Sequence, residues 1–139
     1  MTKNYKILTS YIKDVSSKIS GTENYIYLKD NIPKYSLGID INSLPLKNNM
    51  AEVNIKLTFD NKSDKDKKAY FEMTHTTVIR VEESAVNKNE LKKIFLSDVP
   101  TEMYSEIESK FFEIVKTIGY PDINLEKKIN FKEMFEMYQ

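Results

Sequence analysis

The chain has 139 residues, of which 40% are hydrophobic and 30% are charged, a balance typical of a folded domain rather than of a disordered segment. Lys and Arg together number 21, as do Asp and Glu, so the formal net charge of zero excludes a global field that would hold nucleic acid or an anionic membrane. Cysteine is absent, which excludes disulfides, thiolate metal ligands and thiol nucleophiles.

A chain of this length has room for one core, and we expect residues 1–139 to form a single domain. The first twenty residues mix polar and apolar side chains and lack the continuous apolar run of a signal peptide. No segment approaches the ~18 apolar residues of a membrane span. Together with the absence of cysteine, which suits a reducing compartment, these features predict a cytoplasmic protein.

Four segments with apolar residues at alternate positions predict β-strands. In the first, from Tyr5 to Ile19, the apolar residues fall mainly on odd numbers. The same alternation runs from Tyr35 to Ile41, from Val53 to Phe59 and from Ala69 to Val81. Residues 43–49, which contain a proline and two asparagines, separate the second strand from the third.

Two segments interrupt this pattern and predict loops. Residues 21–33 begin with the turn-like sequence GTEN and include a proline, yet they carry an apolar run, so we expect a loop with unusual apolar mass. Residues 60–68 have no apolar side chain and predict an exposed hairpin loop between the third and fourth strands.

Helical spacing begins after the fourth strand. Leu91, Ile94 and Phe95 fit a short helix that Asn87 or Asn89 caps.

A longer helix is predicted next, with Pro100 in its first turn and with Gly119 and Pro121 at its end. Its apolar stripe consists of Tyr104, Ile107, Phe111, Ile114, Val115 and Ile118. Residues 130–139 predict a third, short helix, with Phe131, Met134, Phe135 and Tyr138 at helical spacing.

Four strands are thus followed by helices, without alternation of the two. This order predicts an α+β fold, a four-stranded antiparallel sheet covered on one face by the C-terminal helices.

Several segments, taken in order, resemble the SecB family of bacterial export chaperones over nearly the whole chain. YIKDVS (residues 11–16) is similar to the family's first strand, and IYLKDNIPKYSLGIDI (26–41) to its crossover loop and second strand. THTTVI (74–79) stands where the family has a glycine-bearing strand segment, and PDINLEKKINFKEMF (121–135) resembles its closing pattern.

The sequence departs from the family pattern at three positions and in charge. Asn31 stands where the crossover loop usually has a bulky aromatic residue, and Thr76 and Thr77 replace the strand glycines. The chain is neutral, whereas family members are typically acidic. We therefore expect a groove of different shape.

The resemblance implies a holding chaperone that binds unfolded preproteins for Sec-dependent protein export. It also implies a homotetramer built as a dimer of dimers, with no cofactor and no nucleotide hydrolysis. The family holds clients in long apolar grooves near the crossover loop and the last helix. The side chains expected to contact a client are Tyr25, Ile26, Tyr27, Leu28, Ile32, Phe131, Met134 and Phe135. The alternative is that these side chains pack into the core.

A partner surface is indicated by strand parity. If odd positions face the helices, Asp14 and Glu72 lie on the outer sheet face, with Leu8, Ile12 and Tyr70 beside them. In the family this face docks the export motor SecA, and the resemblance assigns Asp14, Tyr70 and Glu72 to that contact. The alternative is a face of ordinary solvated charges.

An oligomer interface is expected on the long helix. Met103 and Phe112 lie off its main apolar stripe and are free to contact another subunit. The alternative is that they broaden the buried face of the helix.

No motif indicates catalysis. His75 is the single histidine, and without cysteine a metal site would need several converging carboxylates. Phosphate-binding loops, nucleophile elbows and HExxH sequences are absent.

Two other functions stay open from the sequence. One is a SecB-like chaperone dedicated to one client, such as an antitoxin. The other is a small-ligand-binding domain with a curved sheet, although the odd strand positions offer few polar groups beyond His75, Tyr11 and Tyr35.

Overall fold

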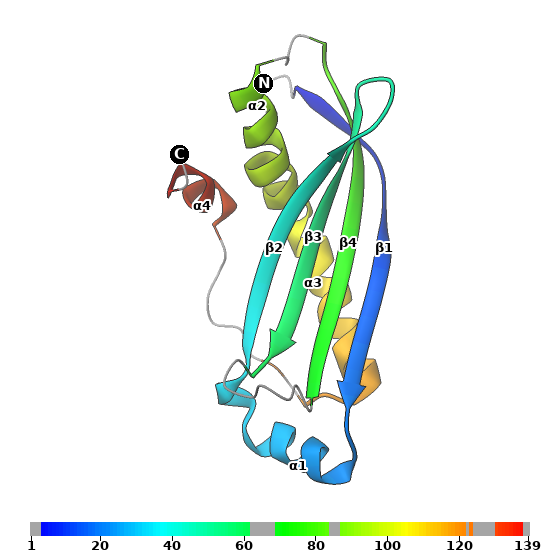
Figure 1. Ribbon diagram of the computed structural model, residues 1–139, viewed down its shortest axis with the longest axis vertical. Helices are drawn as coiled ribbons and strands as arrows, with labels where there is room; N and C mark the ends of the chain where they lie inside the picture. The colour runs from blue at the N-terminus through cyan, green and yellow to red at the C-terminus, as the bar shows by residue number, and fades with distance from the viewer. Residues whose placement is uncertain (1–3, 62–68, 84–86, 122, 124–129, 138–139) are drawn as a thin grey trace.

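The structure is a computed structural model that describes residues 4–61, 69–83, 87–121, 123 and 130–137 (Figure 1). In chain order its elements are β1 (Tyr5–Ile19), α1 (Thr22–Asp30), the 3-10 helix η1 (Ile32–Lys34), β2 (Ser36–Pro45), β3 (Met50–Asp60), β4 (Ala69–Val81), α2 (Lys88–Lys93), the π-helix η2 (Ile94–Asp98), α3 (Val99–Ile118) and α4 (Phe131–Met137).

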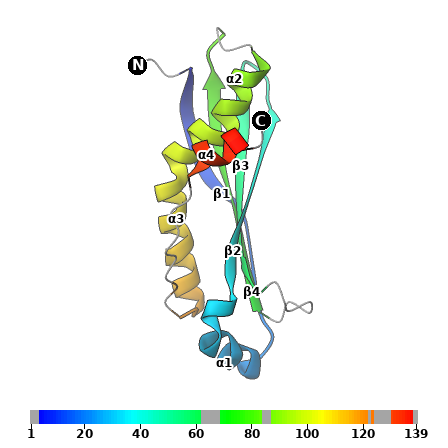
Figure 2. The same ribbon diagram turned by 90° about the vertical axis from the view of Figure 1, so that its left-hand side faces the viewer.

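The four strands form one antiparallel sheet in the order β1-β4-β3-β2. α3 lies along one face of this sheet, and α1 lies across the end at which β1 stops and β2 starts (Figure 1 and Figure 2). No described helix packs on the opposite face, which we call the outer face. The predicted α+β architecture is therefore confirmed.

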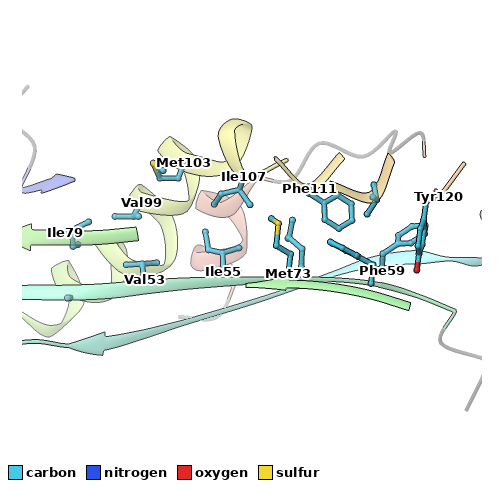
Figure 3. Close-up of a cluster of buried hydrophobic side chains, with 14 of the residues drawn as sticks. Val53, Ile55, Phe59, Met73, Ile79, Val99, Met103, Ile107, Phe111 and Tyr120 are labelled. Carbon is cyan, nitrogen blue, oxygen red and sulfur yellow. The ribbon is translucent and has the colours of Figure 1, made fainter. Parts of the chain in front are cut away.

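The core lies between α3 and the facing side of β3 and β4 (Figure 3). The odd-numbered residues of β3 from Ala51 to Phe59, and those of β4 throughout, are buried, as a period of two predicts. From α3 the sheet receives side chains at helical spacing: Val99, Met103, Ile107, Phe111 and Val115.

Met103 was expected at an oligomer interface, but this core buries it. It therefore offers little surface to another subunit, and the alternative of a broad buried helix face holds for this residue. Phe112 is only half-buried, with its ring edge-on to Phe111 at a centroid distance of 5.6 Å.

Two bulges in β1 change which side chains face the helices. The pairing of β1 with β4 shifts between Ile7 and Thr9 and again between Ile12 and Asp14. Between these shifts the even positions face α3, so Ile12 points toward the core and Tyr11 toward the outer face. The prediction that odd positions face the helices, with Ile12 outside, is wrong for this segment because alternation within one strand does not reveal a bulge.

The segment expected to form an apolar loop instead forms α1 and η1. Leu28 is fully buried in the core, and the Tyr25 hydroxyl donates a hydrogen bond to the carbonyl oxygen of Gly119 at 2.6 Å. The Asn31 side-chain amide donates to the carbonyl oxygen of Tyr27 at the end of the helix. These contacts stabilise a short helix that local turn signals did not indicate.

Turns and caps lie where the sequence predicts them. Asn48 and Asn49, between β2 and β3, both have φ of 61°, a left-handed conformation that asparagine tolerates. The Asn87 side-chain oxygen accepts a hydrogen bond from the backbone N–H of Asn89 at 2.9 Å, which caps α2. Gly119, with φ of 115°, ends α3.

The C-terminal part of the chain agrees with the prediction in outline. α4 confirms the short third helix, although Tyr138 lies outside the described residues. The hairpin loop expected after β3 also lies outside them from residue 62 onward. The π-helix η2, which joins α2 to α3, was not predicted.

A core substitution tests the packing of α3 on the sheet. Ile107 is completely buried, and we expect Ile107→Ala to lower the free energy of unfolding by about 2–5 kcal/mol because it leaves a cavity. Ile118→Ala removes the same atoms from an exposed position on the last turn of α3 and is expected to cost about 0.5 kcal/mol or less. Urea denaturation measures both, and equal losses would contradict this packing.

Candidate functional site

An apolar pocket opens at the edge of the sheet formed by β2. It has a volume of about 260 Å³. Its lining residues, which we call the β2 pocket, are Ile39, Asp40, Ile41, Leu96, Met134 and Phe135. Met134 and Phe135 were expected to contact a client, and both are half-buried here.

Three elements build the walls of this pocket. Ile39 and Ile41 pair with the buried Leu57 and Ile55, so their side chains face the helical side of the sheet. Leu96 comes from η2, where the wider π turn changes the direction in which side chains leave the helix. α4 supplies the remaining wall, and β2 has no further strand beside it among the described residues.

A second apolar surface lies on α1. Ile26 and Tyr27 are 52% and 43% exposed, and we call this pair the α1 patch. The Tyr27 hydroxyl has no hydrogen-bond partner within the described part of the chain, so both side chains are available for contact. Exposed apolar groups of this size beside one another are candidates for a binding surface.

β2 connects the two surfaces. α1 lies at one end of the sheet and α4 in the other half (Figure 1 and Figure 2). From α1 the chain passes through η1 into β2, where the half-buried Leu37 precedes the residues of the β2 pocket. The two predicted groups of client-binding residues therefore do not face one another across a groove but follow one another along β2.

Four residues expected to contact a client are partly or wholly withdrawn from the surface. Leu28 and Phe131 are 0% and 2% exposed, which contradicts their expected role as surface in this state of the protein. Tyr25 is half-buried by its contact with the end of α3, and Ile32 packs against the core. The core thus contains part of the apolar mass that the sequence suggested was exposed.

Phe131 is buried because it anchors α4. Its ring lies edge-on to that of Tyr104 at a centroid distance of 5.2 Å. Burial, together with the nearby carboxylate of Glu108, raises the pKa of Tyr104, so its hydroxyl stays neutral. The neutral aromatic pair holds α4 beside α3 and so forms one wall of the β2 pocket.

The outer face contains the residues assigned to a motor contact. Ser16 pairs with Glu72 and Lys18 with Tyr70, so these side chains share the outer face with Asp14. The Tyr70 and Ser16 hydroxyls lie 3.4 Å apart. The shared face agrees with the parity argument, but the bulge removes Ile12 from it.

Two ion pairs neutralise part of the charge on this outer face. The Lys56 ammonium lies 3.7 Å from the Glu72 carboxylate, and Lys13 lies 3.0 Å from that of Glu52. The hydrogen bond from Lys13 lowers the pKa of Glu52 and keeps it ionised.

A row of polar side chains, buried at Thr76 and Asn54 and exposed at Asn42, crosses the same face. The Thr76 hydroxyl donates to the Asn54 side-chain oxygen at 2.6 Å, and the Asn54 amide donates to the Asn42 side-chain oxygen at 3.0 Å. Sequence reasoning missed this row. The signal that could have revealed it is a polar residue at an even position in each of three neighbouring strands.

Comparison with known proteins identifies the family of this chain. The model of the family described as "Preprotein translocase subunit SecB" matches residues 1–139. The chain belongs to the SecB family. The resemblance inferred from the sequence is therefore confirmed, and the chain is a member of a family of protein-export chaperones.

Two relatives and one solved structure agree with this SecB assignment. A Pelagibacter ubique protein, named provisionally as protein-export protein SecB, is 45% identical over 136 residues, which cover 98% of this chain and 97% of the relative. The protein-export protein SecB of Mesorhizobium japonicum is 24% identical over 132 residues, covering 94% of this chain and 76% of the relative.

The solved structure is a SecB-like chaperone of Mycobacterium tuberculosis in complex with a ChAD peptide from the HigA1 antitoxin. It has a TM-score of 0.66 and 11% identity, covering 91% of this chain and 88% of that one, so the likeness shows the SecB fold alone. Within the residues described, no helix of this SecB-family chain is both long and apolar enough to cross a membrane.

His75 is buried in the core. It is 0% exposed, and the Lys110 ammonium donates to its Nε2 atom at 3.3 Å. Burial lowers the pKa of His75, and the positive charge of Lys110 lowers it further. Over the part of the chain that the structure describes, no group of three His, Cys, Asp or Glu residues could hold a metal ion.

The state of His75 predicts a dependence of stability on pH. An unfolded histidine has a pKa of about 6.5, so below that pH the unfolded chain gains a proton that folded His75 resists. We expect the free energy of unfolding of the wild type, relative to His75→Gln, to fall as the pH falls from about 7.5 to about 5, by at most about 1.4 kcal/mol per pH unit. Urea denaturation across this range measures it, and a constant difference would contradict the assignment.

Proposed function

We propose that this SecB-family protein is a holding chaperone, which binds unfolded preproteins in the cytoplasm and keeps them competent for Sec-dependent export. It acts without enzymatic chemistry and without a cofactor. The observation that carries the proposal is a series of apolar groups that follow one another from α1 along β2, namely the α1 patch, Leu37 and the β2 pocket, which we call the apolar path. An unfolded client offers apolar side chains without a fixed shape, and an elongated apolar surface suits it.

The chemistry of this path favours polypeptide over a small ligand. Among the residues of the β2 pocket, Asp40 is the one with a charged side chain, and the α1 patch adds an aromatic and an aliphatic group. A small-molecule site usually combines an apolar cavity with several convergent polar groups. The path instead offers successive apolar contacts. Such contacts suit an extended polypeptide, whose side chains point alternately to opposite sides.

We also propose that the protein assembles as a homotetramer, a dimer of dimers, as the family resemblance implies. Val15 and Leu8 on the edge strand β1 are exposed, and Phe112 on α3 is half-buried. These apolar groups support contacts between subunits, whereas Met103 is now assigned to the core.

A dedicated client is the second candidate. The Mycobacterium tuberculosis chaperone of similar fold was solved with an antitoxin peptide, which supports a role in holding one antitoxin. Export is the stronger proposal because both curated relatives are named for it.

SecA is proposed as the partner that receives the client. Asp14, Tyr70 and Glu72 share the outer face, which supports docking there. Because Lys56 already pairs with Glu72, the motor must compete with this lysine or rely on Asp14. Asp14 is exposed and has no ion pair within the described ranges.

The apolar path is tested by client capture. Light scattering of the purified protein with a slowly folding, denatured client is expected to show a stable tetramer that captures the client without nucleotide. We expect Tyr27→Ser and Phe135→Ser each to weaken capture about tenfold, because each removes an aromatic contact. Tyr11→Ser is the matched control, since Tyr11 is 44% exposed on the outer face, away from the path.

The measurements test two separate points, namely whether the path is the client site and whether the protein holds clients. Equal capture by wild type, Tyr27→Ser and Phe135→Ser would contradict the path as the client site. A monomer that ignores unfolded chains would contradict the holding function itself.

Motor docking is tested by removing one charge. We expect Asp14→Asn to weaken binding of SecA about two- to fivefold at low ionic strength, because the proposed ion pair between Asp14 and the motor is lost. Asp30→Asn changes an exposed carboxylate on α1, at the end of the sheet, and serves as control. Titration calorimetry measures both, and equal losses would contradict docking at Asp14.

A further inference from the structure

α1 exposes some of its apolar side chains and hides others. Ile26 and Tyr27 are exposed, but Leu28 is completely buried and Tyr25 is half-buried. If the α1 patch binds client, Tyr25 and Leu28, which flank the patch in the sequence, are kept partly or wholly from that contact. The free protein therefore presents less apolar surface than the segment contains.

Few contacts hold α1 in this position. Leu28 is its single buried residue, and the Tyr25 hydroxyl supplies a hydrogen bond, at 2.6 Å, to the carbonyl oxygen of Gly119. That carbonyl belongs to the residue that ends α3, so the bond joins α1 to the far end of the long helix. The Asn24 amide adds a hydrogen bond to the carbonyl oxygen of Ser20 at 2.8 Å, just before the helix. One buried side chain and two side-chain hydrogen bonds thus fasten the helix, and only the bond from Tyr25 reaches α3.

α1 has little stability of its own. It is nine residues long, and its N-cap residue, Gly21, supplies no side chain to hold the free N–H groups of the first turn. Isolated helices of this length are marginal in water and depend on tertiary contacts. Segments with few buried contacts open at a lower free-energy cost than the whole domain does.

We propose that the Tyr25 hydroxyl is a latch, which keeps α1 docked with Leu28 hidden and whose release adds Tyr25 and Leu28 to the client-binding surface. The proposal rests on the holding function proposed above and gives that site a closed and an open state. When α1 leaves, an apolar side chain of the client takes the position of Leu28 in the core. Tyr25 is then a positioning residue in the closed state and a contact residue in the open one.

The latch predicts how the affinity for a client depends on the Tyr25 hydroxyl. For a client that binds only the open state, the apparent affinity equals the intrinsic affinity multiplied by the fraction of protein that is open. Removing one hydroxyl that donates one hydrogen bond raises the open fraction while leaving the aromatic ring available to the client. The affinity should therefore rise about two- to tenfold, the range expected for one hydrogen bond.

The experiment compares Tyr25→Phe with the wild type as full-length proteins. The first readout is the dissociation constant of a denatured, slowly folding client, and the second is hydrogen exchange of the α1 amides in the free protein. Tyr11→Phe is the matched control, because its hydroxyl lies on the outer face without a hydrogen-bond partner among the described residues. We expect Tyr25→Phe to bind client about two- to tenfold more tightly and to exchange faster throughout α1, and Tyr11→Phe to do neither.

Each other outcome overturns a defined part of the argument. If the wild type captures client and Tyr25→Phe binds it equally or more weakly, the latch is wrong while the holding function stands. If the wild type captures no client, the holding function and the latch fall together. Exchange of the wild-type α1 amides as slow as that of β4 would also overturn the latch, because α1 would then open only when the whole domain unfolds.

Discussion

The rest of the structure depends on the packing of α3 against the odd-numbered face of β3 and β4. Phe111 meets Phe71 edge-on with ring centroids 5.3 Å apart, and Ile107 is completely buried beside them. One helix with side chains is about 10 Å wide, so it covers the two central strands and leaves the two edge strands partly uncovered. Apolar residues such as Val15 on β1 and Ile39 on β2 therefore stay exposed or half-buried. The surfaces left for binding lie at the edges and the end of the sheet because α3 occupies its middle.

Most of this architecture could be predicted from the sequence, because β3 and β4 alternate without interruption and α3 carries one continuous stripe. β1 could not be predicted in full. Its two bulges reverse the parity between Ile7 and Asp14, and they depend on the pairing with β4 rather than on residues within β1. The helical state of α1 was missed for the same reason, since Leu28 and Tyr25 stabilise it through contacts with segments distant in the sequence.

The apolar segments of the candidate site were predicted correctly from composition, but the direction in which each of their side chains points was not. The segments that carry aromatic and aliphatic mass were identified, and Ile26, Tyr27 and Phe135 do lie at the surface or in the β2 pocket. Which member of each segment turns inward could not be read from spacing, because α1 has hardly any amphipathic preference of its own. Leu28 and Phe131 are buried because each segment needs one side chain that anchors it to the core. Anchoring and binding compete for the same residue types, and only the packing decides between them.

Electrostatics divides the molecule into two surfaces with different requirements. On the outer face, carboxylates such as Glu52 and Glu72 already have lysine partners, so a docking protein must exchange ion pairs rather than add new ones. Exposed pairs contribute little net free energy, which makes such a contact weak, selective and sensitive to salt. The apolar path along β2 has few charges, and its contacts gain from the release of water rather than from ion pairing. We therefore expect that the proposed client binding and the proposed partner docking can be changed independently, because the two proposals share neither residues nor forces.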